Sequence, residues 1–207
     1  MGRVFTIIFV TFTAFYLCGA GLYLYATTRG KLRVWNEQLD AIPPLGRGRI
    51  LDIGCGRGLV AILAAQRFRN SCVTGLDLWR VADQSGNSYQ AAHLNAVRNR
   101  VSDRVFFRTA DMVNLPFDSG HFDVVTASMS IHNLPSKEQR RQALTEAVRV
   151  LAPSGTLVIV DIQYGVDYAR ELQDLGVEVA PVVNAGWRMW WSGPWMASTI
   201  VVARKPA

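Results

Sequence analysis

Cysteine and histidine are scarce in this sequence, with three of each among 207 residues. Cys18, Cys55 and Cys72 form no C-x-x-C pair, so their spacing indicates neither a zinc site nor a disulfide framework. The histidines are equally scattered along the chain. We therefore expect a protein of a reducing compartment that holds no metal ion.

Acidic residues are missing from the first 33 positions, which contain Arg3, Arg29, Lys31 and Arg33. Once these four of the 22 cations are set aside, the others nearly balance the 16 acids. The net charge of +6 therefore belongs mainly to the N-terminal region, where cations can meet anionic lipid headgroups. No basic surface for nucleic acid is indicated, and we expect no nucleic-acid partner.

Charged residues are also absent from Val4 to Ala26, a run of 23 residues. At 1.5 Å per residue, a helix of this length crosses a hydrocarbon core of about 30 Å. We expect residues 1–30 to form a single-pass membrane anchor, with residues 4–26 in the bilayer. Because more cations follow the run than precede it, the positive-inside rule places the C-terminal part in the cytoplasm. The alternatives are a cleaved signal peptide and a helix that lies on the domain or on the membrane surface.

Glycine recurs at every second position where a predicted strand turns into a helix, within Leu51–Gly58. Glycines let the backbone approach a ligand closely, and the start of a helix offers free N–H groups. The dinucleotide fingerprint G-x-G-x-x-G would need glycine where the chain has Leu59, which disfavours an NAD-dependent oxidoreductase. Asp52 precedes the first glycine by two residues, where its carboxylate can meet a cationic group of a ligand. The expected floor of the nucleotide pocket consists of Gly54, Cys55, Gly56 and Gly58.

Strands and helices alternate from residue 46 onward, after a short predicted helix at 31–41. Some strands are apolar on both faces, as in Leu157–Val160, which is typical of parallel strands buried between helices. Such alternation implies right-handed crossovers and a ligand site at the carboxyl ends of the strands. The predicted strands are 49–53, 72–78, 105–108, 122–126, 156–161, 177–183 and 198–204, and the predicted helices are 59–68, 88–99, 137–151 and 167–175.

Asp77 lies near the end of the second predicted strand, about 20 residues after the glycine loop. An acid at this place can accept hydrogen bonds from both hydroxyls of a ribose. Taken alone, an acid at a strand end is usually just solvated. The polar loop Val81–Asn87 then follows, and we expect it either to cover the ligand or to form a capped helix start.

Several segments beyond the glycine loop match one family pattern. They are Thr109–Met112, Leu115–Phe117, Phe122–Val125 and Lys137–Gly155. With the motif [DE]-x-G-x-G-x-G at residues 52–58, the sequence resembles the class I S-adenosylmethionine-dependent methyltransferases. It lies near the small-molecule branch that includes ubiquinone and menaquinone C-methyltransferases. One departure is the turn Ala152–Gly155, where K-P-G-G is usual.

The resemblance implies a single doubly wound, Rossmann-like α/β domain over residues 46–207, joined to the anchor by a linker helix in residues 31–45. Its sheet would have seven mostly parallel strands, with an antiparallel last strand. One transmembrane helix would precede this domain.

The resemblance also implies S-adenosyl-L-methionine as the cofactor. Asp52 would hold the amino-acid end of the cofactor, directly or through water. Asp77 would bind the ribose and Leu78 would lie beside the adenine. Asp111 would meet the adenine amino group, with Met112 at the ring.

The segment Ser128–Asn133 follows the fourth predicted strand, where the methyl donor would face the acceptor. We expect Ser128 at the cofactor. His132 is the histidine best placed to act as a general base, since an ordinary histidine has a pKa of about 6.5. The alternative is a loop histidine that bonds the backbone or shapes the pocket. The N-P-P-[YF] signature of amino methylation is absent.

Tryptophan is concentrated near the C-terminus, at positions 187, 190, 191 and 195. Its side chain favours membrane interfaces and also lines apolar ligand pockets. An aromatic hairpin that packs on the edge of the sheet is the alternative interpretation.

These features together predict methyl transfer to a small hydrophobic or membrane-associated acceptor, such as a quinone, an isoprenoid or a lipid. Detoxifying methylation of the oxygen or sulfur of small hydrophobic phenols or thiols is an alternative. A membrane-tethered module that binds S-adenosylmethionine without catalysis is another.

Overall fold

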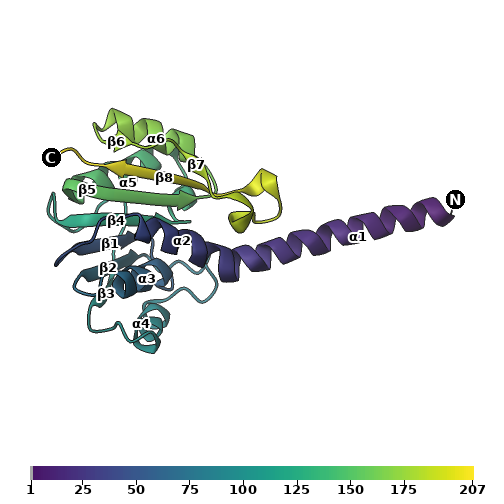
Figure 1. Cartoon of the computed structure of the whole chain (residues 1–207), viewed down its shortest axis with the longest axis horizontal. Helices are drawn as coiled ribbons and strands as arrows, with labels where there is room; N and C mark the ends of the chain where they lie inside the picture. The colour runs from purple at the N-terminus through teal and green to yellow at the C-terminus, as the bar shows by residue number, and fades with distance from the viewer. Residues whose placement is uncertain (1) are drawn as a thin grey trace.

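One long helix projects from an α/β domain in the structure, a computed structural model that describes residues 2–207 (Figure 1). This helix comprises α1 (Gly2–Tyr25), a π-helical turn η1 (Ala26–Gly30) and α2 (Lys31–Asp40), which follow one another without a break. The apolar side chains of α1 are mostly exposed. Within residues 2–207, this is the one helix long and apolar enough to cross a membrane, a test that a signal sequence also passes.

The domain is built on one eight-stranded sheet with the order β3-β2-β1-β4-β5-β8-β6, and β7 pairs with β8. The first five strands in the chain are parallel, and β8 runs antiparallel to β5. The chain order reverses between β1 and β4, so their carboxyl ends form the switch point where such sheets bind ligands. The bounds are β1 Arg49–Ile53, β2 Cys72–Asp77, β3 Val105–Thr109, β4 Phe122–Ser128, β5 Leu151–Asp161, β6 Glu178–Val179, β7 Val183–Asn184 and β8 Thr199–Arg204.

Helices cover both faces of the sheet. On β4, the buried neighbours Val124 and Val125 belong to two different hydrophobic clusters, as the alternation of side chains along a strand requires. The cluster around Val124 includes residues of α2, α3 and α4, and the other includes residues of α5 and α6. The bounds of these helices are α3 Leu59–Arg67, α4 Tyr89–Arg98, α5 Lys137–Val150 and α6 Gly165–Asp174. The predicted doubly wound fold with an antiparallel last strand is confirmed.

The strand predicted over residues 177–183 is interrupted in the structure. Only Glu178–Val179 and Val183–Asn184 pair with β8, and Pro181 lies between them. Proline has no N–H to donate to a ladder, so a continuous strand is disfavoured here. The sheet consequently has eight strands instead of the expected seven.

The helix α2 packs on the sheet together with the rest of the domain. Val34, Trp35 and Leu39 are at most 1% exposed. The indole Nε1 of Trp35 donates a hydrogen bond of 2.9 Å to Oγ of Ser128 at the end of β4. The projecting helix is therefore attached directly to the edge of the sheet where a ligand site is expected.

Candidate active site

A cavity lies at the carboxyl ends of β1, β2 and β4, where the fold predicts a ligand site. Six of the residues predicted to bind the cofactor line it. They are Gly54, Gly56, Asp77, Leu78, Asp111 and Met112.

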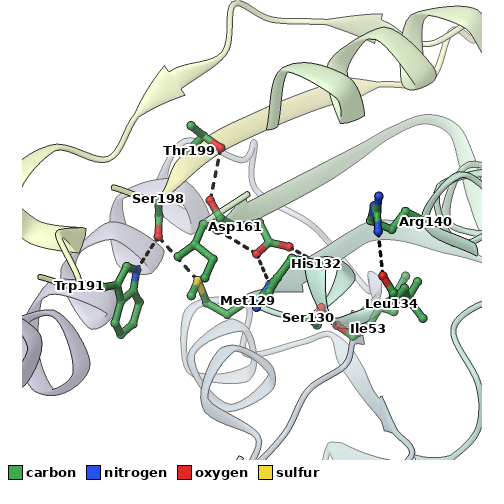
Figure 2. Close-up of polar contacts among 11 residues, drawn as sticks. Ile53, Met129, Ser130, His132, Leu134, Arg140, Asp161, Trp191, Ser198 and Thr199 are labelled. Atoms are coloured by element: carbon green, nitrogen blue, oxygen red, sulfur yellow. Dashed lines mark hydrogen bonds and ion pairs between the residues drawn. The ribbon is translucent and has the colours of Figure 1, made fainter. Parts of the chain in front are cut away.

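The glycine loop forms the floor of this cavity. Gly54 has φ +64° and Gly56 has φ +52°, conformations that favour glycine. A Cβ atom at Gly54 would collide with the side chain of Ser130, which follows β4. Ser130 is fixed in turn because its Oγ donates a 3.0 Å hydrogen bond to the carbonyl of Ile53 (Figure 2). The loop can therefore adopt this conformation and pack against Ser130 because these positions lack a side chain.

Asp77 is held rigidly at the end of β2. Its carboxylate accepts hydrogen bonds from the backbone N–H of Gly56 at 2.8 Å and of Trp79 at 2.6 Å. It also accepts one from Nδ2 of Asn87 at 3.1 Å. The Oδ1 atom of Asn87 is buried and accepts no hydrogen bond from any residue of the described chain. A buried acceptor without a donor is costly, so a ligand hydroxyl at this place would stabilise the site.

The loop Val81–Asn87 precedes a capped helix start and lies over the glycine turn, while its covering of a ligand stays a prediction. Ser88 caps α4, because its Oγ accepts a 3.1 Å hydrogen bond from the N–H of Ala91. The loop also covers the glycine turn, since Oε1 of Gln84 accepts a hydrogen bond from the N–H of Arg57 at 3.2 Å. Gln84 and Asn87 thus line the cavity from above the glycine loop.

Asp111 and Met112 line the cavity directly after β3, and the end of the Met112 side chain lies close to Gly54 of the glycine loop. The Oδ1 atom of Asp111 accepts a hydrogen bond from the N–H of Val113 at 3.1 Å, which fixes the carboxylate in a local turn. Met112 and Leu78 supply apolar surface to the same cavity. An acid with apolar neighbours suits a flat heterocycle that carries an amino group.

Asp52 lies beneath the cavity and is only 1% exposed. Its carboxylate accepts hydrogen bonds from Oγ1 of Thr126 at 2.8 Å and from the N–H of Ala61 at 3.1 Å. Burial raises the pKa of Asp52 to about 7, an effect that these hydrogen bonds and Lys31 only partly offset. Asp52 does not line the cavity, so the structure does not place it in direct contact with a ligand there.

Three other predicted cofactor residues do not line the cavity. Gly58 precedes α3 with φ +83°, and Ser128 accepts the hydrogen bond from Trp35. Cys55 is buried, and burial, with the charges of Asp52 and Asp77, raises the pKa of its thiol well above the ordinary value. These residues support the shape of the loop and the position of α2.

His132 pairs with a buried carboxylate at the end of β5. Its Nδ1 lies 2.5 Å from Oδ1 of Asp161, and its backbone N–H donates to Oδ2 at 3.1 Å (Figure 2). Asp161 is 1% exposed, whereas the histidine side chain is 16% exposed. This close contact does not have hydrogen-bond geometry, so Nδ1 is a buried atom without a hydrogen-bond partner among residues 2–207. His132 does not itself line the cavity, although its neighbour Asn133 does.

Lys31 is a cavity residue that the sequence indicated only as a membrane-flanking cation. Burial lowers its pKa, and the nearby charges of Asp52 and Asp161 act in the opposite direction. Within residues 2–207, no carboxylate lies within ion-pair distance of its ammonium group. Its position could have been inferred from helical spacing, because Lys31 shares a helix face with the buried Val34 and Trp35.

The sequence of this domain matches a known protein family. A family described as "Methyltransferase domain" matches residues 51–159, which is more than half of the chain and runs from β1 through most of β5. The chain belongs to this methyltransferase family. Family membership confirms the predicted cofactor, S-adenosyl-L-methionine.

Individual relatives agree with the family. The chain is 37% identical over 137 residues to 27-O-demethylrifamycin SV methyltransferase of Amycolatopsis mediterranei, covering 66% of this chain and 45% of that protein. It is 34% identical over 134 residues to demethylmenaquinone methyltransferase of Lactiplantibacillus plantarum, covering 64% and 53% respectively. The chain thus spans about half the length of these curated relatives.

A solved geranyl diphosphate methyltransferase, in complex with its diphosphate substrate and sinefungin, has the same fold. The TM-score is 0.66 at 19% identity, over 84% of this chain and 77% of that one.

The residues at the cavity fit the cofactor. Asp77 and the unpartnered Oδ1 of Asn87 can receive ribose hydroxyls, and Asp111 with Leu78 and Met112 can receive the adenine.

Proposed function

We propose that this protein transfers a methyl group from S-adenosylmethionine to a small hydrophobic or membrane-dissolved acceptor such as a quinone, an isoprenoid or a lipid. One observation carries the proposal most directly. Lys31, which lines the cavity, follows the apolar helix α1 after the single turn η1. The reaction site is therefore at the base of the helix that would enter the membrane.

The names of the relatives support the acceptor class. A demethylmenaquinone methyltransferase and a geranyl diphosphate methyltransferase are both named for acceptors with hydrophobic chains. An exposed apolar helix next to the cavity adds a route by which such an acceptor can arrive without crossing water.

We further propose that α1 is a single-pass anchor and that the domain lies on the cytoplasmic side. Its charge-free run is long enough to cross the hydrocarbon core, and Arg29, Lys31 and Arg33 follow that run. Residues 1–30 then form the anchor. The burial of Val34, Trp35 and Leu39 suggests that the methyltransferase domain begins with α2.

The residues of the cavity have separate tasks in this reaction. Bound S-adenosylmethionine supplies a methyl group on a sulfonium; the bond from this methyl to sulfur breaks, with its electron pair going to sulfur, as the acceptor's nucleophile bonds to carbon. Asp77 and Asn87 hold the ribose and thereby align the methyl group. Met129 and Leu134 supply apolar surface at the acceptor end, beside the ammonium of Lys31.

His132 supplies the proton acceptor in this scheme. Its backbone N–H is held by Asp161 and its neighbour Asn133 lines the cavity, so we expect the imidazole to accept a proton from an acceptor O–H, N–H or S–H as the bond to carbon forms. Asp161 stabilises the imidazolium that results.

The test uses the full chain solubilised in detergent, with S-adenosylmethionine labelled on its methyl group. A total lipid extract and an extract of water-soluble metabolites are offered in parallel. We expect label to enter a lipid product with release of S-adenosylhomocysteine. Cofactor binding without release would indicate a binding module, and equal or better methylation of small phenols or thiols would favour the detoxifying activity.

A further inference from the structure

The segment from residue 187 to residue 196, here called the tryptophan segment, has no role in the reaction described above. It contains η3 (Gly186–Met189) in part and η4 (Pro194–Met196). Beyond Arg188, the chain carries no charged residue from position 189 to position 203. Trp187 is 53% exposed and Trp195 is 65% exposed. Large exposed indoles in a charge-free segment are characteristic of a surface that meets something apolar.

The tryptophan segment lies along the base of the projecting helix, as Figure 1 shows in yellow beside purple. Three aromatic pairs follow one another along α1. The ring centroids are 4.9 Å apart for Trp187 and Tyr25, 5.9 Å for Trp191 and Tyr23, and 5.8 Å for Trp195 and Phe15. The backbone also comes close, because a Cβ at Gly19 would lie 3.5 Å from the carbonyl oxygen of Ser192.

These contacts set the depth of the segment if α1 spans a bilayer. Phe15 precedes Ala26, the end of the apolar run, by a helical distance of about 16 Å. Half of a hydrocarbon core is about 15 Å. The Trp195 ring, stacked on Phe15, would then lie within the hydrocarbon region rather than outside it.

The polar groups of the segment are suited to such a place, because many bond to one another. Nε1 of Trp195 donates to Oγ of Ser192 at 3.1 Å, and Nε1 of Trp191 donates to Oγ of Ser198 at 2.9 Å (Figure 2). Backbone N–H groups of Trp191 and Met196 donate to carbonyls within the segment at 3.0 and 3.1 Å. Internal pairing of this kind is what a non-aqueous environment demands.

Cations mark the level at which the apolar region ends. Arg29 and Arg33 follow α1, and Nη1 of Arg33 donates to the hydroxyl of Tyr25 at 3.0 Å. Arg188, the second residue of the tryptophan segment, lies at the same level. Its guanidinium pairs with Glu37 of α2, and its backbone packs against Gly30. These three arginines would meet anionic headgroups while the indoles lie below them.

We propose that the tryptophan segment is a second membrane-embedded element, inserted beside α1 from the side of the domain. The inference rests on the proposed anchor, since α1 sets the level of the bilayer. It adds a consequence for the site: Ser198, which bonds Trp191, also contacts Sδ of Met129 at 3.6 Å, and Met129 lines the cavity. The embedded segment thus holds the acceptor end of the cavity at the membrane surface.

The experiment uses the full chain in vesicles of phosphatidylcholine and phosphatidylglycerol whose acyl chains carry bromine, a contact quencher of tryptophan fluorescence. Trp195→Phe keeps an aromatic ring against Phe15. We expect it to remove at least roughly a third of the lipid-dependent quenching, because Trp195 is the deepest and most exposed of the three indoles that pack along α1. Trp79→Phe, at the end of β2 in the domain, is the matched control and should leave this quenching unchanged.

Two results would overturn the inference. In one, Trp195→Phe leaves lipid quenching intact but removes quenching by aqueous acrylamide, which places the indole in water. In the other, quenching depends on protein density in the vesicles, and cross-links form between copies, which makes a second chain the occupant. Alkaline carbonate extraction distinguishes failure of the embedded segment from failure of the anchor. Release of the whole chain contradicts the anchor itself, whereas retention of the chain with lipid quenching unchanged by Trp195→Phe contradicts only the embedded segment.

Discussion

The two ends of the cavity differ in how their charged groups are satisfied. At the end near β2, the carboxylate of Asp77 already accepts three hydrogen bonds from Gly56, Trp79 and Asn87. At the end near β4 and β5, the ammonium of Lys31 has no ion-pair partner within residues 2–207, and burial lowers its pKa. One end is preorganised, and the other carries a charge that a ligand can still satisfy.

The two ends also differ in their position relative to the matched family segment. The preorganised end consists of strand ends and a glycine loop that belong to the family segment 51–159. Lys31 and the tryptophan segment lie outside that segment. Cofactor binding should therefore depend on the first end, and acceptor choice and membrane position on the second.

The largest expected effect lies at the acceptor end. Replacing His132 with Ala should lower kcat about 1,000-fold, since a positioned general base contributes 10²–10⁴-fold. The dissociation constant of S-adenosylmethionine should stay unchanged, because His132 does not line the cavity. Single-turnover kinetics and equilibrium dialysis measure the two quantities. Replacing the other loop histidine, His121, is the control; a kcat loss of similar size there would remove His132 from the mechanism.

Asp77→Asn should weaken S-adenosylmethionine binding about 100-fold. The substitution loses charge-assisted hydrogen bonds to the ribose, and its amide cannot accept from all of the present donors. Equilibrium dialysis provides the measurement. Asp103→Asn, a change at an exposed carboxylate paired with Arg104, should have no effect. Equal binding by both variants would mean that the end near β2 does not hold the nucleoside.

We expect Asp52 to make the cofactor-free protein less stable as pH rises. Its folded pKa of about 7 exceeds its unfolded value of 3.8, so between these values the folded state binds more protons than the unfolded state. The free energy of unfolding should fall by about 2 kcal/mol between pH 5.5 and pH 8, then level off above the folded pKa.

Denaturant unfolding at several pH values measures this dependence. Asp52→Asn should flatten it, because the amide does not titrate. If the free energy of unfolding instead rose over the same pH range, and Asp52→Asn removed that rise, the carboxylate would be ionised and well paired in the folded state.

Lys31→Met should have the smallest effect. We expect about a tenfold rise in KM for the substrate whose anionic group meets Lys31, either S-adenosylmethionine or an acidic acceptor. Arg33→Met is the matched control, since Arg33 lies two residues on and bonds Tyr25 outside the cavity. Initial rates with each substrate varied in turn provide the values. If both variants changed KM alike, a general membrane effect would replace a role of Lys31 in the cavity.

The sequence was sufficient for the features whose signal is local. Gly54, Gly56, Asp77 and Asp111 lie at or just after the ends of predicted strands, and the structure places them around one cavity. Asp52 was harder to interpret, because it is buried by tertiary packing and bonds Thr126, which is distant in sequence, as well as Ala61 in the following helix. The helical spacing that puts Lys31 on the face of Val34 and Trp35 is present in the sequence, but the packing of that face on the sheet, through Trp35 on Ser128, is not, and Lys31 was missed for that reason.

A calorimetric titration of the unmodified full chain with S-adenosylmethionine, with NAD as the comparison ligand, measures directly whether the cavity binds the methyl donor. The preorganised end formed by Asp77, Asn87 and the glycine loop predicts saturable heat at one site for S-adenosylmethionine and none for NAD. No saturable heat with S-adenosylmethionine, or equal binding of NAD, would show that the cavity is not a specific site for S-adenosylmethionine.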